Sequence, residues 1–148
     1  MLSLRSDRKR ALALALIVAA LASAALAAAA SGVVLGSKAF APNGWGWGTK
    51  KPARIFNGGD PSGSVTEIHW RSWGGPTAIG FGKNPIFKPG GGYYRRLAKI
   101  ELRAEEIGTC QGHRAYRRLS VRVPSHPGGK LGHWQLWAGA TSICSAPY

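Results

Sequence analysis

Residues 66–82 limit most strongly what this chain can fold into. Their side-chain types alternate with a period of two, and the alternation is interrupted once. A period of two is the pattern of a β-strand whose two faces meet different surroundings. The face that is expected to point inward carries Thr66, Ile68 and Trp70. Gly74-Gly75-Pro76 then ends the run, because glycine allows a positive φ and proline lacks a backbone donor.

The second half of this stretch has almost no side chains on one of its faces. That face carries Ala78, Gly80 and Gly82. A large indole can lie over such a bare surface, and aromatic cross-strand packing of this kind stabilises a sheet. Residues 66–82 therefore predict a β-hairpin that is packed by its own tryptophan.

Further alternating runs follow, and segments rich in glycine and proline separate them. Residues 93–106 contain many helix formers, yet their period of two favours a strand over a helix. Residues 119–123 alternate clearly, and residues 133–143 hold the last strand or two. Five to seven short strands in about 85 residues predict an all-β fold, either a small antiparallel sandwich or a partly open barrel.

The first 30 residues have the pattern of an export signal. A basic start precedes residues 11–30, which are apolar apart from Ser23 and end in alanines that suit cleavage before Ser31. The alternative is an uncleaved membrane anchor, since the run is just long enough to span a bilayer, although alanine inserts weakly. The sequence predicts a signal peptide over residues 1–30 and a secreted or extracytoplasmic protein.

Residues 31–63 are expected to form a flexible basic lead-in before a β domain over residues 64–148. The lead-in is rich in glycine, proline, serine and asparagine and has few sustained apolar runs. Trp45 and Trp47 could touch a membrane interface beside the basic residues that follow them, or could tuck against the domain. The sequence leaves both interpretations open.

The chain has two cysteines, Cys110 and Cys144. In an exported protein such a pair is expected to form a disulfide. Chain-entropy reasoning gives that bond about 4 kcal/mol of stabilisation. A metal site of Cys110, His113 and Cys144 is the weaker alternative, because it lacks a second paired motif and an exported protein meets an oxidising environment. We therefore predict one disulfide, no metal and no cofactor.

The net charge is +14, and removal of residues 1–30 would leave about +11. An exported protein meets anions in envelope polymers, lipid headgroups and acidic glycans. The predicted partners are anionic envelope polymers or glycans, whereas export argues against nucleic acid. Membrane contact is expected only through the signal segment or through weak surface charge. A basic surface that serves solubility alone is the favoured explanation of the charge, and the oligomeric state stays open.

Three polar residues of the first run are the candidates for catalysis. Glu67, His69 and Arg71 share the outward face of the expected strand, and a carboxylate beside an imidazole can do acid–base work. A solvent-facing polar ladder has the same pattern, however. The chain also lacks the usual nucleophile, zinc and phosphate-loop motifs. The sequence argues against an enzyme and leaves a hydrolase that uses Glu67 and His69 as an alternative.

Two tryptophan pairs are the candidates for binding, since indoles on a basic surface can bind sugar rings or stack on bases. The members of each pair lie three residues apart, so on a strand they point to opposite faces. Trp70 and Trp134 are expected in the core. Trp73 and Trp137 then stay as the binding candidates.

Four short motifs form a recognisable set: IHWRSWG at 68–74, AIGFG at 78–82, CQG at 110–112 and YRRLSVRVP at 116–124. Over residues 64–130 the chain resembles a family of small, exported, functionally uncharacterised proteins of high-GC bacteria. Arg71 departs from the small residue expected at its position. The resemblance implies an exported β-domain and carries over no catalytic residues.

The sequence as a whole predicts a non-enzymatic binding module or a module associated with the cell envelope. Besides the hydrolase, one further alternative is a cationic protein that acts on anionic membranes or nucleic acid.

Overall fold

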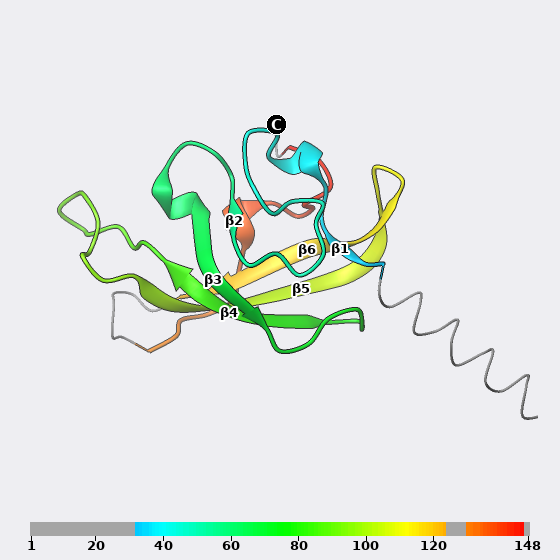
Figure 1. Ribbon diagram of the computed structural model, residues 1–148. Helices are drawn as coiled ribbons and strands as arrows, with labels where there is room; N and C mark the ends of the chain where they lie inside the picture. The colour runs from blue at the N-terminus through cyan, green and yellow to red at the C-terminus, as the bar shows by residue number, and fades with distance from the viewer. Residues whose placement is uncertain (1–31, 124–129, 147–148) are drawn as a thin grey trace, which may run out of the picture. The chain divides into compact units, whose positions relative to one another are not determined.

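The computed structural model describes residues 32–123 and 130–146. The predicted signal peptide, residues 1–30, lies outside the described residues. Strands and short 3-10 helices (η) make up the regular structure (Figure 1). Along the chain these elements are β1 (Val34–Leu35), η1 (Lys38–Phe40), β2 (Ile55–Phe56), η2 (Pro61–Gly63), β3 (Ser64–Trp70), β4 (Ala78–Asn84), β5 (Ala98–Cys110), β6 (His113–Arg122), β7 (Gln135–Leu136) and η3 (Trp137–Gly139).

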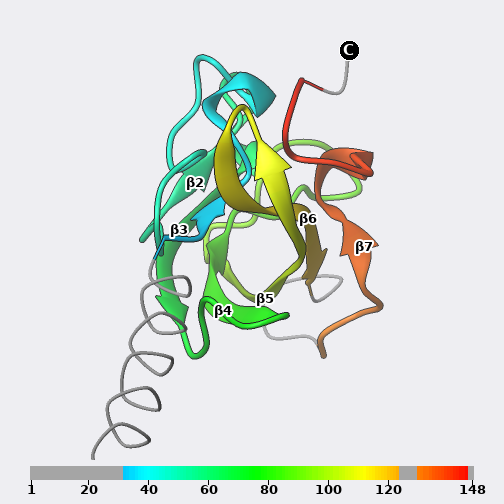
Figure 2. The ribbon, with the colours of Figure 1, turned by 90° about the vertical axis from the view of Figure 1, so that its right-hand side faces the viewer.

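The strands form one curled half-barrel sheet with the order β1-β6-β5-β4-β3-β2, and β7 also pairs with β6 (Figure 2). All neighbouring strands are antiparallel except β1, which runs parallel to β6 with Val34 opposite Ala115. The predicted all-β fold is confirmed in its partly open barrel form, with a mixed sheet. No helix among the described residues is long and apolar enough to span a bilayer.

The predicted hairpin is confirmed as β3 and β4. Trp70 lies opposite Gly80, and a Cβ at position 80 would meet the indole at 2.9 Å, so the bare face is where the ring packs. The predicted inward face is partly wrong, because the register shifts between Thr66 and His69. Glu67 adopts a φ of 51° there. Because of the extra residue in this β-bulge, Val65 points into the core and Thr66 does not.

β5 and β6 form the longest hairpin of the sheet. Gln111 and Gly112 join them with φ values of 49° and 80°, the two positive values that a type I′ turn requires. The inward side chains of β5 and β6 supply much of the core, which confirms the two strands predicted there. These side chains include Ile100, Leu102, Ala104 and Leu119.

The flexible lead-in predicted over residues 31–63 is wrong. Gly32–Tyr148 form one compact unit, and the core includes Val33, Phe40, Trp47 and Ile55. The Trp47 indole donates to the Phe56 carbonyl at 3.0 Å, and its ring lies 4.6 Å from the Phe40 ring. The buried rings of this segment lie on irregular, glycine-rich backbone, so apolar and polar residues do not alternate in its sequence. A glycine-rich segment without such alternation is typical of a linker, which is why a linker was predicted.

Tyr116 fixes the connection between β3 and β4 in place. Its buried hydroxyl accepts from the Gly74 amide at 2.8 Å and donates to the Gly75 carbonyl at 2.7 Å. Burial raises the pKa of the Tyr116 phenol, so it stays protonated and able to donate. The Trp73 ring packs edge-on against Tyr116 at 5.2 Å.

We expect Tyr116→Phe to lower the free energy of unfolding by about 1–3 kcal/mol, because the buried Gly74 amide would lose its acceptor. Urea denaturation measures the change. Tyr93→Phe is the control, since Tyr93 forms its hydrogen bond at the exposed surface. Equal effects of the two substitutions would contradict the assignment.

Candidate functional site

The predicted catalytic residues lie on the exposed outer face of the sheet and do not form an acid–base pair. Glu67 forms an ion pair with Lys83 at 2.7 Å, and both side chains are largely solvated. The Arg71 guanidinium lies 5.4 Å from the centre of the Phe81 ring, and His69 is opposite Phe81 in the register. None of these three candidates lines either of the two described pockets. This arrangement matches the solvated polar ladder.

Trp137 was expected to be free for binding, and the structure contradicts this. Only 5% of its surface is exposed, and its indole donates to the Asn57 side-chain oxygen at 3.0 Å. Its ring centre lies 6.3 Å from that of Trp47. Trp137 is therefore a core residue that joins the C-terminal part of the chain to the segment predicted as a linker.

Trp73 lies at the rim of the core and is half-buried. Its indole donates to the Val33 carbonyl at 3.0 Å, and its ring meets the Trp70 ring edge-on at 4.6 Å. The expected position at the turn is confirmed. The donor of the indole is used within the protein, however, so Trp73 offers a ligand only part of its ring.

Trp134 was expected in the core and instead lies on the outer face. The guanidinium groups of Arg103 and Arg122 lie 4.5 and 4.9 Å from the centre of its ring. Arg122 also donates two hydrogen bonds to the nearly buried Glu101, which lies beside it on β5. Glu101 pairs with Arg122 only, and the two guanidinium groups cover the Trp134 ring rather than leave it free.

Each glutamate among the described residues forms an ion pair. The pairs are Glu67–Lys83, Glu101–Arg122, Glu105–Arg103 and Glu106–Arg118. Asp60 is also engaged, and hydrogen bonds from the Ser62 hydroxyl and then from Tyr93 hold the pKa of its carboxyl below the usual value. These carboxylates are thus all paired with groups of the protein itself, and the remaining lysines and arginines carry the net positive charge.

Trp45 is the most exposed large hydrophobic residue of the described chain, at 52%. Two backbone hydrogen bonds with Phe56 fix it to the edge of the sheet, and the Arg54 guanidinium lies 4.8 Å from the centre of its ring. Phe81, with Arg71 over it, is a second exposed arginine–aromatic pair. From the sequence, Trp45 could either touch a membrane interface or tuck against the domain, and the pairing with Phe56 is what fixes it at the edge of the sheet.

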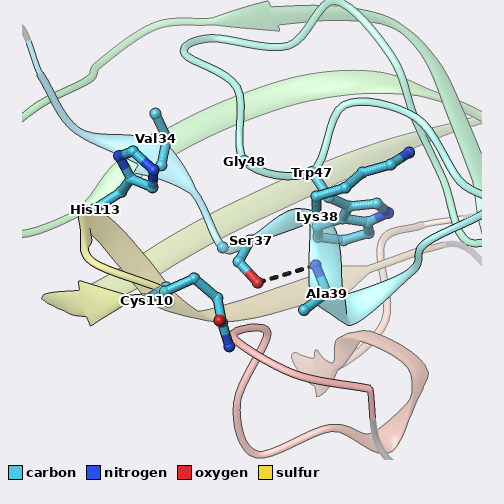
Figure 3. Close-up of a pocket in the computed structure, with 10 residues that line it drawn as sticks. Val34, Ser37, Lys38, Ala39, Trp47, Gly48, Cys110 and His113 are labelled. Carbon is cyan, nitrogen blue, oxygen red and sulfur yellow. Dashed lines mark hydrogen bonds between the residues drawn. The ribbon is translucent and has the colours of Figure 1, made fainter.

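A pocket of about 380 Å³ opens beside the disulfide (Figure 3). Ser37, Lys38, Trp47 and His113 are among the residues that line it, and none of the lining residues has a carboxylate. The Ser37 hydroxyl accepts from the Ala39 amide and donates to the Cys144 carbonyl. The Lys38 ammonium donates to the Gly44 carbonyl at 2.5 Å. The pocket can admit a small ligand but contains no paired carboxylate and base.

The disulfide prediction is confirmed. Cys110 and Cys144 are bonded with their Cα atoms 5.0 Å apart, so neither thiol is available to the alternative metal site with His113. Among the described residues, no three acidic, histidine or cysteine side chains gather as a metal site would need. The bond is compatible with an extracytoplasmic location.

Comparison with family models, curated proteins and solved structures finds no match to this chain. The family resemblance drawn from the four sequence motifs therefore stays a prediction. Function is therefore inferred from the arrangement of the side chains. That arrangement favours the exposed arginine–aromatic pairs as a binding surface over the polar ladder and the pocket.

Proposed function

We propose that this protein is a non-enzymatic, extracytoplasmic module that binds anionic polymers of the cell envelope. One observation carries the proposal: the described glutamates are all paired within the protein, whereas Arg54 rests on an exposed, backbone-fixed Trp45. The signal pattern of residues 1–30 and the disulfide support the location.

The Trp45–Arg54 pair suits a polymer that combines apolar ring faces with negative groups. An indole face stacks on the C–H face of a sugar, and a guanidinium binds carboxylate or phosphate with two parallel hydrogen bonds. Lys50 and Lys51 are exposed and lie a few residues before Arg54. Their ammonium groups add attraction at longer range, which depends on ionic strength.

We expect Trp45→Ala to weaken binding of Gly32–Tyr148 to polygalacturonate, a carboxylated polysaccharide, about tenfold. Titration calorimetry at low and moderate salt measures the change, with neutral dextran as the reference polymer. Phe87→Ala is the matched control, because Phe87 is equally exposed, at 51%, on a different element. Salt should weaken the binding of the unmodified protein without abolishing it, since stacking is not screened.

Two results would contradict the proposal. Equal losses in the Trp45 and Phe87 variants would mean that no defined surface binds the polymer. Breakdown of the polymer that stops in Glu67→Gln would establish the hydrolase alternative, because Glu67 takes no part in the proposed binding surface.

A further inference from the structure

The connection between β4 and β5, residues 85–97, is an ordered hairpin and not a loose loop. Phe87 pairs antiparallel with Tyr93, the Lys88 amide donates to the Gly92 carbonyl at 2.8 Å, and the Tyr94 amide donates to the Ile86 carbonyl at 3.0 Å. Figure 1 shows this light-green connection reaching away from the strands at the left of the view. We call it the 85–97 hairpin.

The hairpin is attached to the body of the protein through a side chain. The Tyr93 hydroxyl donates to the Asp60 carboxylate, and Asp60 is itself fixed because it accepts from the Ser62 amide and hydroxyl. The Phe87 and Tyr93 rings lie 4.6 Å apart. The hairpin therefore has its conformation before a partner binds, so the entropy cost of ordering it on binding is small.

Apolar side chains and cations are exposed together on this hairpin. Phe87 and Leu97 are exposed at 51% and 44%, which makes them two of the five exposed large hydrophobics in the described chain. Lys88, Arg95 and Arg96 are exposed beside them, and residues 85–97 contain no aspartate or glutamate. At the tip, a Cβ built on Gly90, Gly91 or Gly92 would meet nothing within 4 Å, so nothing in the protein covers it.

We propose that the 85–97 hairpin docks on an anionic lipid bilayer. Phe87 and Leu97 would enter the boundary between headgroups and acyl chains, while Lys88, Arg95 and Arg96 meet the lipid phosphates and acidic headgroups. Leu97 is aliphatic and has no ring face to stack on a sugar, whereas the acyl region of a bilayer can bury it together with Phe87, so this surface fits lipid better than the polymer proposed for the Trp45 side. The sequence predicted membrane contact through the signal segment or weak charge and left Trp45 and Trp47 open as interface residues, and this hairpin adds a contact at a different place.

Sedimentation of Gly32–Tyr148 with vesicles tests the proposal, since this compact unit lacks the apolar residues 11–30 and has a core of its own. Vesicles that mix phosphatidylglycerol with phosphatidylcholine are compared with vesicles of phosphatidylcholine alone. We expect Phe87→Ala to lower partitioning into the anionic vesicles about tenfold. Arg95→Gln with Arg96→Gln should lower it about 30-fold.

Trp45→Ala is the matched control and should change the vesicle partitioning less than about twofold. Both aromatic positions are exposed, so neither substitution should impair folding, and circular dichroism checks this. An unchanged partitioning of the Phe87 variant would overturn the inference. Equal losses in the Phe87 and Trp45 variants, or equal binding to both kinds of vesicle, would also overturn it. Because the polymer experiment depends on Trp45, either proposal can fail while the other stands.

Discussion

Replacing Cys110 and Cys144 together by alanine is expected to lower the free energy of unfolding by about 4 kcal/mol. The bond joins residues 34 positions apart and holds the C-terminal segment against the turn of the longest hairpin. That segment supplies the fully buried Ile143, whose amide donates to the Arg117 carbonyl at 2.8 Å and whose carbonyl accepts from the Ser37 amide at 3.0 Å. Without the disulfide, the burial of Ile143 and its two backbone hydrogen bonds can be lost together.

Guanidinium denaturation of the oxidised protein, the reduced protein and the double-alanine variant measures this effect. The reduced protein and the variant should agree within about 1 kcal/mol, because both lack the same cross-link. If reduction leaves the denaturation midpoint where it is, the stabilising role of the bond is disproved. Ser142→Ala, two residues before Cys144, serves as the control for local changes in the segment, because it removes only the 3.3 Å hydrogen bond from the Cys144 amide.

Trp137→Ala is expected to cost about 3–5 kcal/mol, the range for removing a large buried aromatic side chain. The substitution removes an indole that contacts the Trp47 ring and bonds to Asn57, so it also leaves the Asn57 oxygen without its donor. Thermal and urea denaturation measure the loss. Trp45→Ala, at an exposed position, should stay within about 0.5 kcal/mol of the unmodified protein.

This comparison separates a packing role from a binding role for Trp137. A variant that keeps its full stability but loses affinity for polygalacturonate would restore the original prediction of a binding residue. A large loss of stability would place Trp137 in the core with Trp47, as its burial indicates.

The strands of the sheet were predictable wherever alternation ran for several residues. The run that contains Ile100 and Leu102, and the run around Leu119, give β5 and β6 directly. The bulge in β3 was not predictable, because it places Glu67, and not a glycine, at a φ of 51°. A strict period of two therefore assigned Thr66 to the wrong face.

The buried part of residues 32–63 left no periodic signal. Trp47 is covered by segments far from it in sequence, and its neighbouring glycines allow the backbone to approach closely. A Cβ on Gly46 would lie 2.2 Å from the Arg54 carbonyl oxygen. Glycine-rich composition is equally typical of a flexible linker, so only the tertiary structure distinguishes the two.

The contacts in the candidate sites could not be predicted from the sequence either, because they depend on which residues the strand register brings together. Pairing of Glu101 with Arg122 follows from the alignment of β5 and β6, and Trp134 lies just before the two-residue β7, against Arg103 and Arg122 of those strands. The exposed pair of Trp45 and Arg54 needs the bridge to Phe56. The sequence supplied the residue types of a basic, aromatic surface, and the fold decided which of them face solvent.

The parallel pairing of β1 with β6 also bears on how the chain reaches its folded state. It places Val34 beside Ala115, and the Ser37 amide bonds to Ile143, so both ends of the described chain are needed to finish the core. Contacts between such distant residues cost loop-closure entropy before they contribute burial, so folding should be slow for a chain of this length. A molecule that lacks the part of the chain from Trp137 onward would lose the indole that lies beside Trp47 and the buried Ile143, and would be prone to aggregate.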